Sequence, residues 1–507
     1  MKDKILFWID NEWLRFCIAK AIQDSYDCDL YAVIDMRYTS TKFFQKQQIV
    51  KFLKTWFYRD YISKTEKEPD LEYLKYFEKT YKINLWEVAY AERFFHNHNP
   101  YHKFTDKEIC SILERECKLF EEILDEIKPN FLIMKLTDSH QSNLMVQLCK
   151  AKGIKVLMMG PTRFAYKYDI YEDYDKITPF SNIEKINLST TKTFEELQNY
   201  LKKYQAIQDI TTFKERTKLS PWTRVKKYIR YLLLVGNKEF QDYYANYGKT
   251  RFKIITRFFF IIRPLRKHFI DKNFISQIDS SEPFVYFPLH AEPERSVLLV
   301  APFYTNQLEI ITHIAKSLPI GYKLYVKEHP GMFEYAWREI NYYKKILDLP
   351  NVRLVHPSTS SEELLKKCSL VVTITGTTGL EAAFYNKSSI VFADVSYSVL
   401  PSVYRIKNIE DMPYAIRLML NKQVDIDALN KYVEVGEKSF LEIKLWDLYL
   451  DFNDHFSDEF VNGFGINITE QKMNDFLSSH KIQLEEVARA HIDKIMYYKK
   501  IDSKDHL

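Results

Sequence analysis

Short apolar runs rich in β-branched residues, each followed by a turn and a helical segment, recur in two series along this 507-residue chain. The first series begins with predicted strands at Lys4 to Ile9 and Leu30 to Ile34, which flank a helix from Leu14 to Asp24. The second series begins at Pro283 and includes helices predicted around Met332 to Leu347 and from Ser361 to Lys367. Residues 42 to 126 are expected to be mostly helical. Alternating strands and helices are typical of a parallel sheet covered by helices. We therefore expect an α/β fold with two Rossmann-like, doubly wound domains.

Polar loops follow the strands of the first series. Two more strands are predicted there, from Phe131 to Lys135 and from Ile154 to Met159. Ligands of such sheets collect at the carboxyl ends of the strands. We therefore expect three loops to line one cleft: Asp10 to Glu12, Thr137 to His140 and Gly160 to Arg163.

Four titratable residues in these loops are candidates for acid–base catalysis. Asp138 and His140 are the best placed, because each can carry or accept a proton near neutral pH. Asp10 and Glu12, after the first strand, are the fallback. The alternative is that Asp138 or Ser139 only caps the helix that follows.

The candidate ligand-binding residues are most concentrated in the second series, between Leu324 and Phe392. The run KLYVKEHPGMF predicts a strand that ends in Lys327, His329 and Pro330. The run CSLVVTITGTTGLEAAFYNKSSIVF predicts a buried parallel strand, a turn and a helix. A helix N-terminus favours an anion, so a phosphate is the expected guest. The residues that we expect to bind it are Lys327, His329, Pro330, Gly376, Thr377, Thr378 and Gly379.

Further candidates for binding the same ligand lie near this turn. Glu381, one turn into the helix, could accept a hydrogen bond from a sugar hydroxyl. The strand Phe284 to Phe287 ends in a loop that holds His290, Glu292 and Glu294. The alternative is a purely structural role, in which His-Pro forms only a turn and Gly-Thr-Thr-Gly only connects a strand to a helix with an N-cap.

Positive charge is concentrated in one segment. Residues 214 to 272 hold sixteen Lys and Arg against four Asp and Glu, whereas the whole chain is only +5. Aromatic and aliphatic residues interleave with these charges, which is typical of helices on an anionic membrane surface or a polyanionic acceptor. A solvated helical connector is an equal alternative. Nucleic acid is disfavoured, because no recognised nucleic-acid motif accompanies the charge.

Other patterns point away from metal sites, export and membrane spans. The six cysteines are scattered without a CxxC spacing, which indicates reduced thiols in a cytoplasmic protein. No apolar run approaches the roughly 18 residues of a membrane span, and the N-terminal run is too short for a signal peptide. We discount a metal at His96, His98 and His102, because no cysteine or clustered carboxylate completes a ligand set. The Asp pairs 27/29 and 425/427 resemble metal-nucleotide motifs of some glycosyltransferases, but each lies where a strand or helix begins, so chance is favoured. We expect no cofactor and no metal.

The runs VYFPLHAEPE, KLYVKEHP and VVTITGTTGLEAAFYNKSSIVF resemble the capsule polysaccharide biosynthesis family, between residues 283 and 397. These are bacterial glycosyltransferases of GT-B fold that include Kdo transferases. In related CMP-sugar transferases an HP motif and a paired Ser/Thr motif contact the nucleotide and its phosphate. The matching positions here are His329 with Pro330 and Thr377 with Thr378. The family's usual GxP turn is replaced by residues 386 to 388, Asn-Lys-Ser, so the nucleobase side can differ.

The resemblance implies an activated-sugar donor held between two Rossmann-like domains without a catalytic metal, and a glycan or glycolipid acceptor. The leading interpretation is a cytoplasmic or membrane-peripheral glycosyltransferase with a CMP-sugar donor. The alternatives are a sugar-nucleotide epimerase, a CDP-glycerol-type glycerophosphotransferase and a non-catalytic assembly protein. The expected domains are an acceptor-side domain, a basic connector, a nucleotide-sugar domain and C-terminal helices, at residues 1–180, 181–275, 276–425 and 426–507.

Overall fold

A computed structural model of the chain describes most of its residues. They are 2–36, 38–62, 68–93, 95, 102–162, 167–173, 180, 183, 188, 190–203, 262–279, 281–292, 294–333, 337–456, 460–461, 464–465 and 468–504. The chain forms two compact units. Unit 1 comprises Met1–Asp173, Ala206–Lys253 and Phe440–Leu507, and unit 2 comprises Tyr174–Gln205 and Ile254–Ser439. The segment predicted as separate C-terminal helices, 426–507, is thus divided between the units.

Unit 1 is built on a six-stranded sheet of order β3-β2-β1-β4-β5-β6, in which only β6 is antiparallel to its neighbour. Its strands are β1 (Asp3–Asp10), β2 (Cys28–Asp35), β3 (Lys54–Phe57), β4 (Phe131–Lys135), β5 (Lys155–Pro161) and β6 (Tyr168–Tyr171). A small hairpin of β13 (Phe460–Val461) and β14 (Phe464–Gly465) belongs to the same unit.

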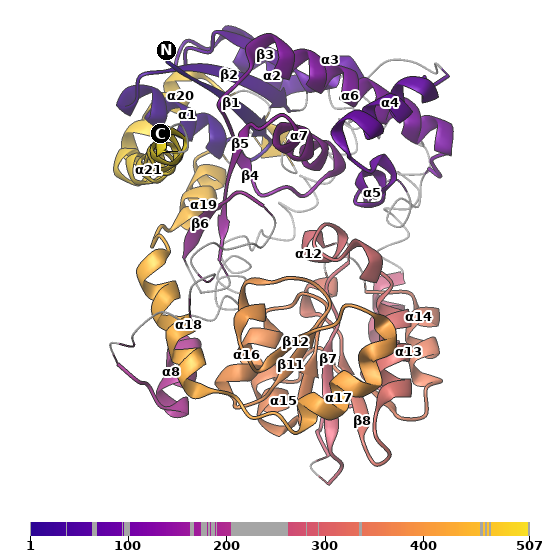
Figure 1. Cartoon of the computed structure of the whole chain (residues 1–507). Helices are drawn as coiled ribbons and strands as arrows, with labels where there is room; N and C mark the ends of the chain where they lie inside the picture. The colour runs from indigo at the N-terminus through magenta and orange to yellow at the C-terminus, as the bar shows by residue number, and fades with distance from the viewer. Residues whose placement is uncertain are drawn as a thin grey trace. The chain divides into compact units, whose positions relative to one another are not determined.

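Helices cover both faces of this sheet (Figure 1). They are α1 (Leu14–Ser25), α2 (Tyr38–Lys46), α3 (Tyr58–Ile62), α4 (Leu71–Tyr81), α5 (Leu85–Tyr90), α6 (Asp106–Ile127), α7 (His140–Ala151), α19 (Leu445–His455), α20 (Glu470–Ser479) and α21 (Lys481–Lys504). The long helix α6 begins at a capping box, in which Glu108 N donates to Thr105 Oγ1 at 3.2 Å and Thr105 N donates to Glu108 Oε2 at 2.7 Å.

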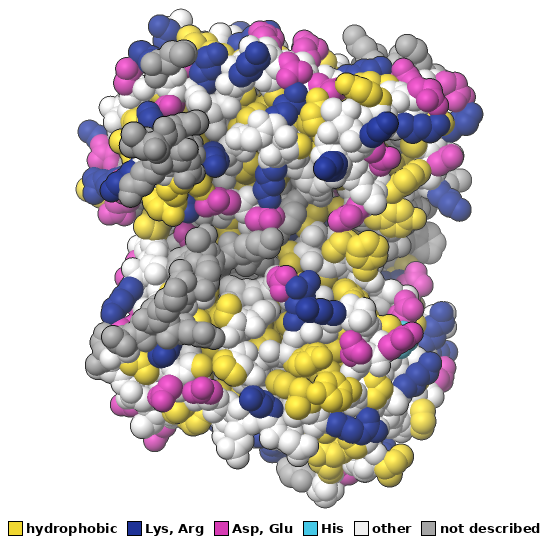
Figure 2. Space-filling model, viewed as in Figure 1, with side chains coloured by type: hydrophobic (Ala, Val, Ile, Leu, Met, Phe, Trp, Pro, Cys, Tyr) yellow, Lys and Arg dark blue, Asp and Glu magenta, His cyan; other side chains and the backbone are white. Residues whose placement is uncertain are grey.

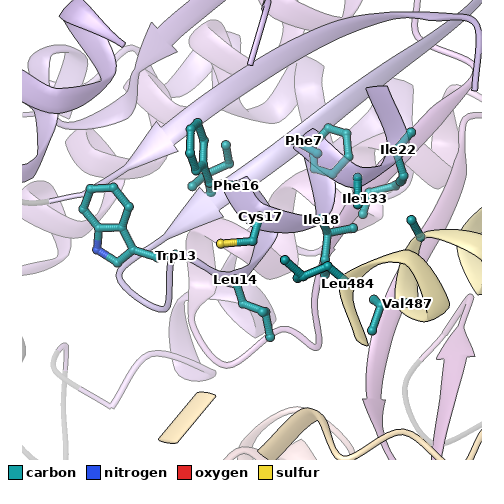
Figure 3. Close-up of a cluster of buried hydrophobic side chains, with 14 of the residues drawn as sticks. Phe7, Trp13, Leu14, Phe16, Cys17, Ile18, Ile22, Ile133, Leu484 and Val487 are labelled. Atoms are coloured by element: carbon teal, nitrogen blue, oxygen red, sulfur yellow. The ribbon is translucent and has the colours of Figure 1, made fainter. Parts of the chain in front are cut away.

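The C-terminal helix completes the core of unit 1. Figure 1 shows α21, in yellow, beside α1, in indigo. Figure 3 shows side chains of both helices in one apolar cluster, with Cys17 and Ile18 from α1 and Leu484 and Val487 from α21. Phe7, on β1, belongs to the same cluster and is fully buried. The last helix of the chain therefore seals the face of the first sheet.

Unit 2 is built on a six-stranded parallel sheet of order β12-β11-β10-β7-β8-β9. Its strands are β7 (Phe284–Pro288), β8 (Lys323–Lys327), β9 (Val352–Val355), β10 (Leu370–Val372), β11 (Ser389–Val391) and β12 (Val403–Arg405). The sheet core combines apolar side chains such as Val285, Val326 and Val372, all fully buried.

Short helices surround this second sheet. They are α8 (Phe194–Lys203), a helix at 262–273, α12 (Arg295–Leu298), α13 (Gln307–Ser317), α14 (Ile340–Leu347), α15 (Ser361–Lys367), α16 (Thr378–Phe384), α17 (Met412–Leu420) and α18 (Ile426–Ser439), with the single turns η4 (Pro302–Tyr304), η5 (Pro330–Phe333), η6 (Ser396–Val399) and η7 (Ile409–Asp411).

The predicted α/β class with two Rossmann-like domains is confirmed, because each unit has a parallel-dominated sheet with helices packed on it. Among its described residues, the region 42 to 126 is mostly helical, as predicted, and it also contains the short edge strand β3. One local prediction was wrong. The helix predicted from Met332 to Leu347 begins only at Ile340, because Trp337 has a left-handed φ of 62° and Arg338 turns into the core.

The described helices include none that is long and apolar enough to cross a bilayer. Figure 2 shows Lys and Arg mixed with Asp and Glu over the visible face of the described residues. The segregated positive charge of residues 214 to 272 falls largely on 214–261, which lie outside the described residues.

Candidate functional site

The order of the second sheet creates a switch point between two neighbouring strands. From β7 the chain proceeds through β8 to β9 on one side, then crosses to β10 on the other. The loops that follow β7 and β10 therefore leave the sheet in opposite directions. In open α/β sheets, ligands bind in the crevice that this divergence opens at the carboxyl ends of the strands. Most of the predicted donor-binding residues follow β7, β8 and β10, at this edge.

His290 joins the two loops that meet at the switch point. It follows β7 and is only 6% exposed. Its Nε2 lies 3.3 Å from Thr373 Oγ1 and accepts from Thr375 N at 3.4 Å, both in the segment after β10. On its other side, Nδ1 lies 3.3 Å from Glu294 Oε2. Burial would raise the pKa of Glu294, but His290 outweighs it and lowers that pKa.

The glycines of the turn after β10 are required by close packing. A Cβ atom at Gly376 would lie 2.6 Å from Thr373 Oγ1, and one at Gly379 would lie 2.7 Å from Tyr397 Oη. Tyr397 in turn donates to the carbonyl oxygen of Gly376. The turn is thus held by protein contacts. Thr377, exposed, and Thr378, half-buried, are the residues of the turn that solvent reaches most readily.

Lys327 and Glu381 are two buried or half-buried charges at the same edge. Lys327 ends β8, is 6% exposed, and donates to Ser361 Oγ at 2.7 Å. Burial lowers the pKa of Lys327 to about 8, although the charge of Glu381 opposes this effect. Burial also raises the pKa of the Glu381 carboxyl, against a hydrogen bond from Thr377 and the charge of Lys327. Burial alone does not neutralise Lys327 at neutral pH, so it remains available to an anion.

Arg338 fixes the loops after β7 and β8, and nothing in the sequence pattern singled it out. Its Nε lies 3.0 Å from Glu328 Oε2, its Nη1 lies 2.5 Å from Glu292 Oε2, and its Nη2 donates to the carbonyl oxygen of His290. Burial would lower the pKa of Arg338, but Glu328 and Glu292 outweigh it and raise that pKa. Tyr343 also donates to Glu328, at 2.6 Å.

These contacts change the role of two predicted residues. Glu292 accepts from Gln307 Nε2 at 2.5 Å as well as pairing with Arg338, so its carboxylate is occupied by the scaffold. His329 is half-buried, and its Nδ1 accepts from Gly331 N at 3.0 Å. Burial lowers the pKa of His329 despite nearby carboxylates. Its ring is therefore neutral near pH 7, with Nε2 left for a ligand. Pro330, which is exposed, begins the turn η5.

A second charged cluster occupies the switch point of the first sheet, between β1 and β4. Lys135, the last residue of β4, lies 2.8 Å from Asp10 Oδ2, 3.0 Å from Asp138 Oδ2 and 3.5 Å from Glu12 Oε1. Arg15 lies 2.7 Å from Glu12 Oε2. Three of the four predicted acid–base residues are thus brought together around a lysine that the sequence marked only as a strand end.

The charges in this cluster stabilise each other. Burial would lower the pKa of Lys135, but Asp10, Asp138 and Glu12 outweigh it and raise that pKa well above its usual range. Burial would likewise raise the pKa of Asp10, but Lys135 and Arg15 outweigh it and lower that pKa. Asp10 is 7% exposed, whereas the side chains of Glu12 and Asp138 are 36% and 38% exposed. Asp138 and Glu12 are therefore the carboxylates that an outside hydroxyl can reach.

The predicted base His140 is placed elsewhere. It is fully buried, with Nδ1 2.7 Å from Glu92 Oε2 and Nε2 2.8 Å from Glu116 Oε1. Burial would lower the pKa of His140, but Glu116 and Glu92 outweigh it and raise that pKa to about 10. An imidazolium with both nitrogens engaged cannot accept a proton from a substrate. The capping alternative for Asp138 is also unsupported, because Ser139, with Ser142, forms the cap of α7.

The remaining sequence candidates have local partners. His102 lies 3.2 Å from Glu108, Asp27 pairs with Lys2 at 2.6 Å, and Asp425 accepts from Asp427 N and Ala428 N at the start of α18. His96, His98 and Arg163 lie outside the described residues. Among the residues that are described, no group of three or more His, Cys, Asp and Glu could hold a metal ion.

Residues 191–401 match the model of a family described as capsule polysaccharide biosynthesis protein. The predicted resemblance to the capsule polysaccharide biosynthesis family is confirmed. The match includes the strands β7 to β11 and every predicted donor-binding residue, but covers less than half of the 507-residue chain. No curated protein sequence matches this chain.

Solved structures resemble this chain only weakly. The β-Kdo 2,7 transferase of KpsC from Thermosulfurimonas dismutans is 12% identical with a TM-score of 0.31, over 69% of this chain and 87% of that one. The β-Kdo 2,4 transferase of the same protein is 13% identical with a TM-score of 0.30, over 60% and 79%. A UDP-GlcNAc 2-epimerase from Methanocaldococcus jannaschii is 14% identical with a TM-score of 0.25, over 86% and 98%. Similarities this low do not identify a function.

Proposed function

We propose that the protein is a glycosyltransferase that moves a sugar from a nucleotide-sugar donor to a surface polysaccharide or lipid-linked glycan. The observation that supports this most is the position of Lys327 and His329 with the 376–379 turn. They lie at the switch point of one parallel sheet, inside the segment that matches the capsule polysaccharide biosynthesis family. Nucleotides bind at such points. A CMP-sugar is the favoured donor, because the HP and paired-threonine motifs resemble those of CMP-sugar transferases.

On the donor side, the departing phosphate must be stabilised as its negative charge develops. Lys327 supplies the charge, His329 supplies a neutral imidazole, and the hydroxyls of Thr377 and Thr378 supply donors. Glu381 accepts from a sugar hydroxyl. His290 and Glu292 act differently, because their contacts hold the two loops in place.

On the acceptor side, Asp138 is the proposed general base, with Glu12 as the fallback. Its side chain is 38% exposed, and Lys135 fixes one of its oxygens at 3.0 Å. Asp10 orients Lys135 and is a weak base, because its own pKa is lowered. His140 is left out of this mechanism because it is buried between two carboxylates.

A screen of CMP-, UDP-, GDP- and CDP-linked donors, with nucleotide release as the readout, tests this proposal. We expect the purified protein to release nucleotide from one donor class, CMP-linked sugars first. Conversion of the donor into its epimer would indicate an epimerase instead. Failure to release nucleotide from any class, with candidate glycan acceptors present, would contradict a glycosyltransferase.

A further inference from the structure

A second arginine lies at the switch point of the second sheet. Arg295 is the first residue of α12, directly after the loop that carries His290 and Glu294. The carbonyl oxygen of Ser296 accepts from Thr375 Oγ1 at 3.2 Å, which ties the start of α12 to the segment after β10. The backbone of Arg295 is therefore held where the loops of β7 and β10 meet.

The guanidinium of Arg295 makes no ion pair within the described part of the chain. Its Nε and Nη2 atoms are enclosed by protein and make no hydrogen bond among the described residues. Glu294, its neighbour in the chain, is turned to His290 instead. Arg338 offers the contrast, because Glu328 and Glu292 both pair with its guanidinium. The protein therefore supplies partners for the charge of Arg338 but not for the guanidinium of Arg295.

Two enclosed guanidinium nitrogens without a hydrogen-bond partner are costly, and the group cannot relieve that cost by losing its proton. Lys327 has a similar deficit, because it is 6% exposed and the group that it hydrogen-bonds is the neutral hydroxyl of Ser361. The negative charge of Glu381 raises the pKa of Lys327, but the hydrogen bond of Lys327 goes to Ser361 and not to that carboxyl. Burial raises the pKa of the Glu381 carboxyl, which makes its charge less favourable. Two under-neutralised cations on neighbouring loops of one sheet edge favour an anion from outside the protein.

We propose that Arg295 binds a phosphate group of the substrate. This inference rests on the proposed function and extends it to a residue outside the HP and Gly-Thr-Thr-Gly motifs. The planar fork of a guanidinium can hold two phosphate oxygens at once, which a lysine cannot do. Arg295 then sets how the phosphate lies, and Lys327 supplies a point charge.

Titration calorimetry with inorganic pyrophosphate tests this inference without requiring the right nucleobase or sugar. We expect Arg295→Gln to weaken pyrophosphate binding by about tenfold to a hundredfold, because charge-assisted hydrogen bonds are lost. Arg295→Lys keeps the charge and should fall between this variant and the wild type. The matched control is Arg417→Gln on α17, where the arginine is exposed and donates to the carbonyl oxygen of Pro413 at 2.9 Å. That variant should bind pyrophosphate as the wild type does.

The melting temperature separates binding from a structural role. Arg295→Gln removes no side-chain hydrogen bond or ion pair within the described protein, so its melting temperature should match or exceed that of the wild type. A structural arginine would show the reverse, as expected for Arg338→Gln. Equal pyrophosphate affinity in Arg295→Gln and the wild type would overturn the inference, and so would a wild type that binds no pyrophosphate.

The donor screen distinguishes this inference from the proposed function. If the wild type binds pyrophosphate through Arg295 but releases nucleotide from no donor, the anion site stands and the glycosyltransferase proposal fails. If the wild type turns over a donor and Arg295→Gln binds and turns over as well as the wild type, the glycosyltransferase stands and the role of Arg295 is wrong.

Discussion

The proposed role of Lys327 predicts that nucleotide binding weakens in mild alkali. Burial lowers its pKa to about 8, so it is charged below that pH and neutral above it. We expect nucleotide affinity to fall by about tenfold or more as the pH rises from 7 to 9.5, because a charge-assisted hydrogen bond is lost. His329 does not contribute in this range, since burial lowers its pKa from an ordinary value already below 7.

Calorimetric titration with the nucleotide that the donor screen identifies measures this dependence. In Lys327→Arg the charge persists to high pH, so the affinity should stay flat from pH 7 to 9.5. An equally steep decline in Lys327→Arg would place the titrating group elsewhere.

Asp138→Asn separates the chemical step from donor binding. The amide keeps the shape of the carboxylate and can still accept from Lys135, but it cannot take a proton. We expect donor affinity to be unchanged and transfer to fall by about 10² to 10⁴, the usual contribution of a general base. Loss of the ion pair with Lys135 should cost no more than about 1 kcal/mol, because Asp138 is partly exposed.

Asp125→Asn is the matched control for this variant. Asp125 pairs with Lys152 at 2.6 Å on an exposed surface of α6, away from the carboxyl ends of the strands. It should leave both transfer and donor affinity unchanged. A fully active Asp138→Asn protein would move the assignment of the base to Glu12.

At the level of single residues, the sequence predicted positions at strand ends better than it predicted roles. Asp10 and Asp138 follow strands whose apolar runs were clear, so their meeting at one sheet edge was foreseeable. His140, two residues after Asp138, is turned into a helical layer by Glu92 and Glu116, which lie far away in sequence. The partners of Arg338 are distant in the same way, and no spacing rule connects such residues.

At the level of elements, the buried imidazolium of His140 joins three helical segments of unit 1. His140 begins α7, Glu116 lies on α6, and Glu92 follows α5. The pKa of His140 is raised from 6.5 to about 10, so its stabilising effect is complete below about pH 6.5 and is lost as the pH rises to 10. We expect this loss to appear as a falling melting temperature over that range.

His140→Gln tests the assignment. It removes the imidazolium that lies between the buried carboxylates of Glu92 and Glu116, and should cost about 3–5 kcal/mol at pH 6. It should also remove most of the fall in stability between pH 6.5 and 10. His313→Gln is the control, because His313 is 37% exposed and lies 3.9 Å from Glu309; it should cost less than about 0.5 kcal/mol. An unchanged pH profile in His140→Gln would contradict a charged His140.

The C-terminal helix allows a paired test on one element. Leu484 is 2% exposed and packs in the cluster of Figure 3, whereas Ile482, also on α21, is 73% exposed. We expect Leu484→Ala to lower the free energy of unfolding by about 2–5 kcal/mol, because it leaves a cavity between α21 and α1. Ile482→Ala should change it by less than about 0.5 kcal/mol. Chemical denaturation measures both, and equal effects would show that α21 does not seal the sheet.

Helices and strands were predictable where the local sequence pattern and the tertiary environment favour the same secondary structure. The predicted strand Phe131 to Lys135 and the helix Ser361 to Lys367 have the observed bounds, since a buried parallel strand and a capped helix each leave a strong pattern. β3 was missed because its run Lys-Thr-Trp-Phe is short and lies at the sheet edge. The region after Pro330 was mispredicted as one helix, because its chain bends to bring Arg338 to Glu328.

For the whole molecule, the basic segment is the feature that bears on location. Residues 214 to 272 carry sixteen cations, each worth about 1 kcal/mol near an anionic leaflet. We propose that this segment holds the protein on acidic membrane lipid. The protein should co-sediment with vesicles that contain anionic lipid and be released at about 1 M salt, where the Debye length falls to about 3 Å. Vesicles of zwitterionic lipid are the control, and equal binding to both kinds would favour a plain connector.

The return of the chain to unit 1 determines the order in which a newly made molecule can fold. The strands β1 to β6 leave the ribosome first, but α21, which covers α1, is synthesised more than three hundred residues after Asp173. At a synthesis rate of about 5–20 residues per second, the apolar face of unit 1 remains uncovered for tens of seconds. Unit 2 can close its sheet during that wait. The core of unit 1 is therefore completed only after unit 2 has been made, and a truncation before α21 would leave the apolar cluster of unit 1 uncovered.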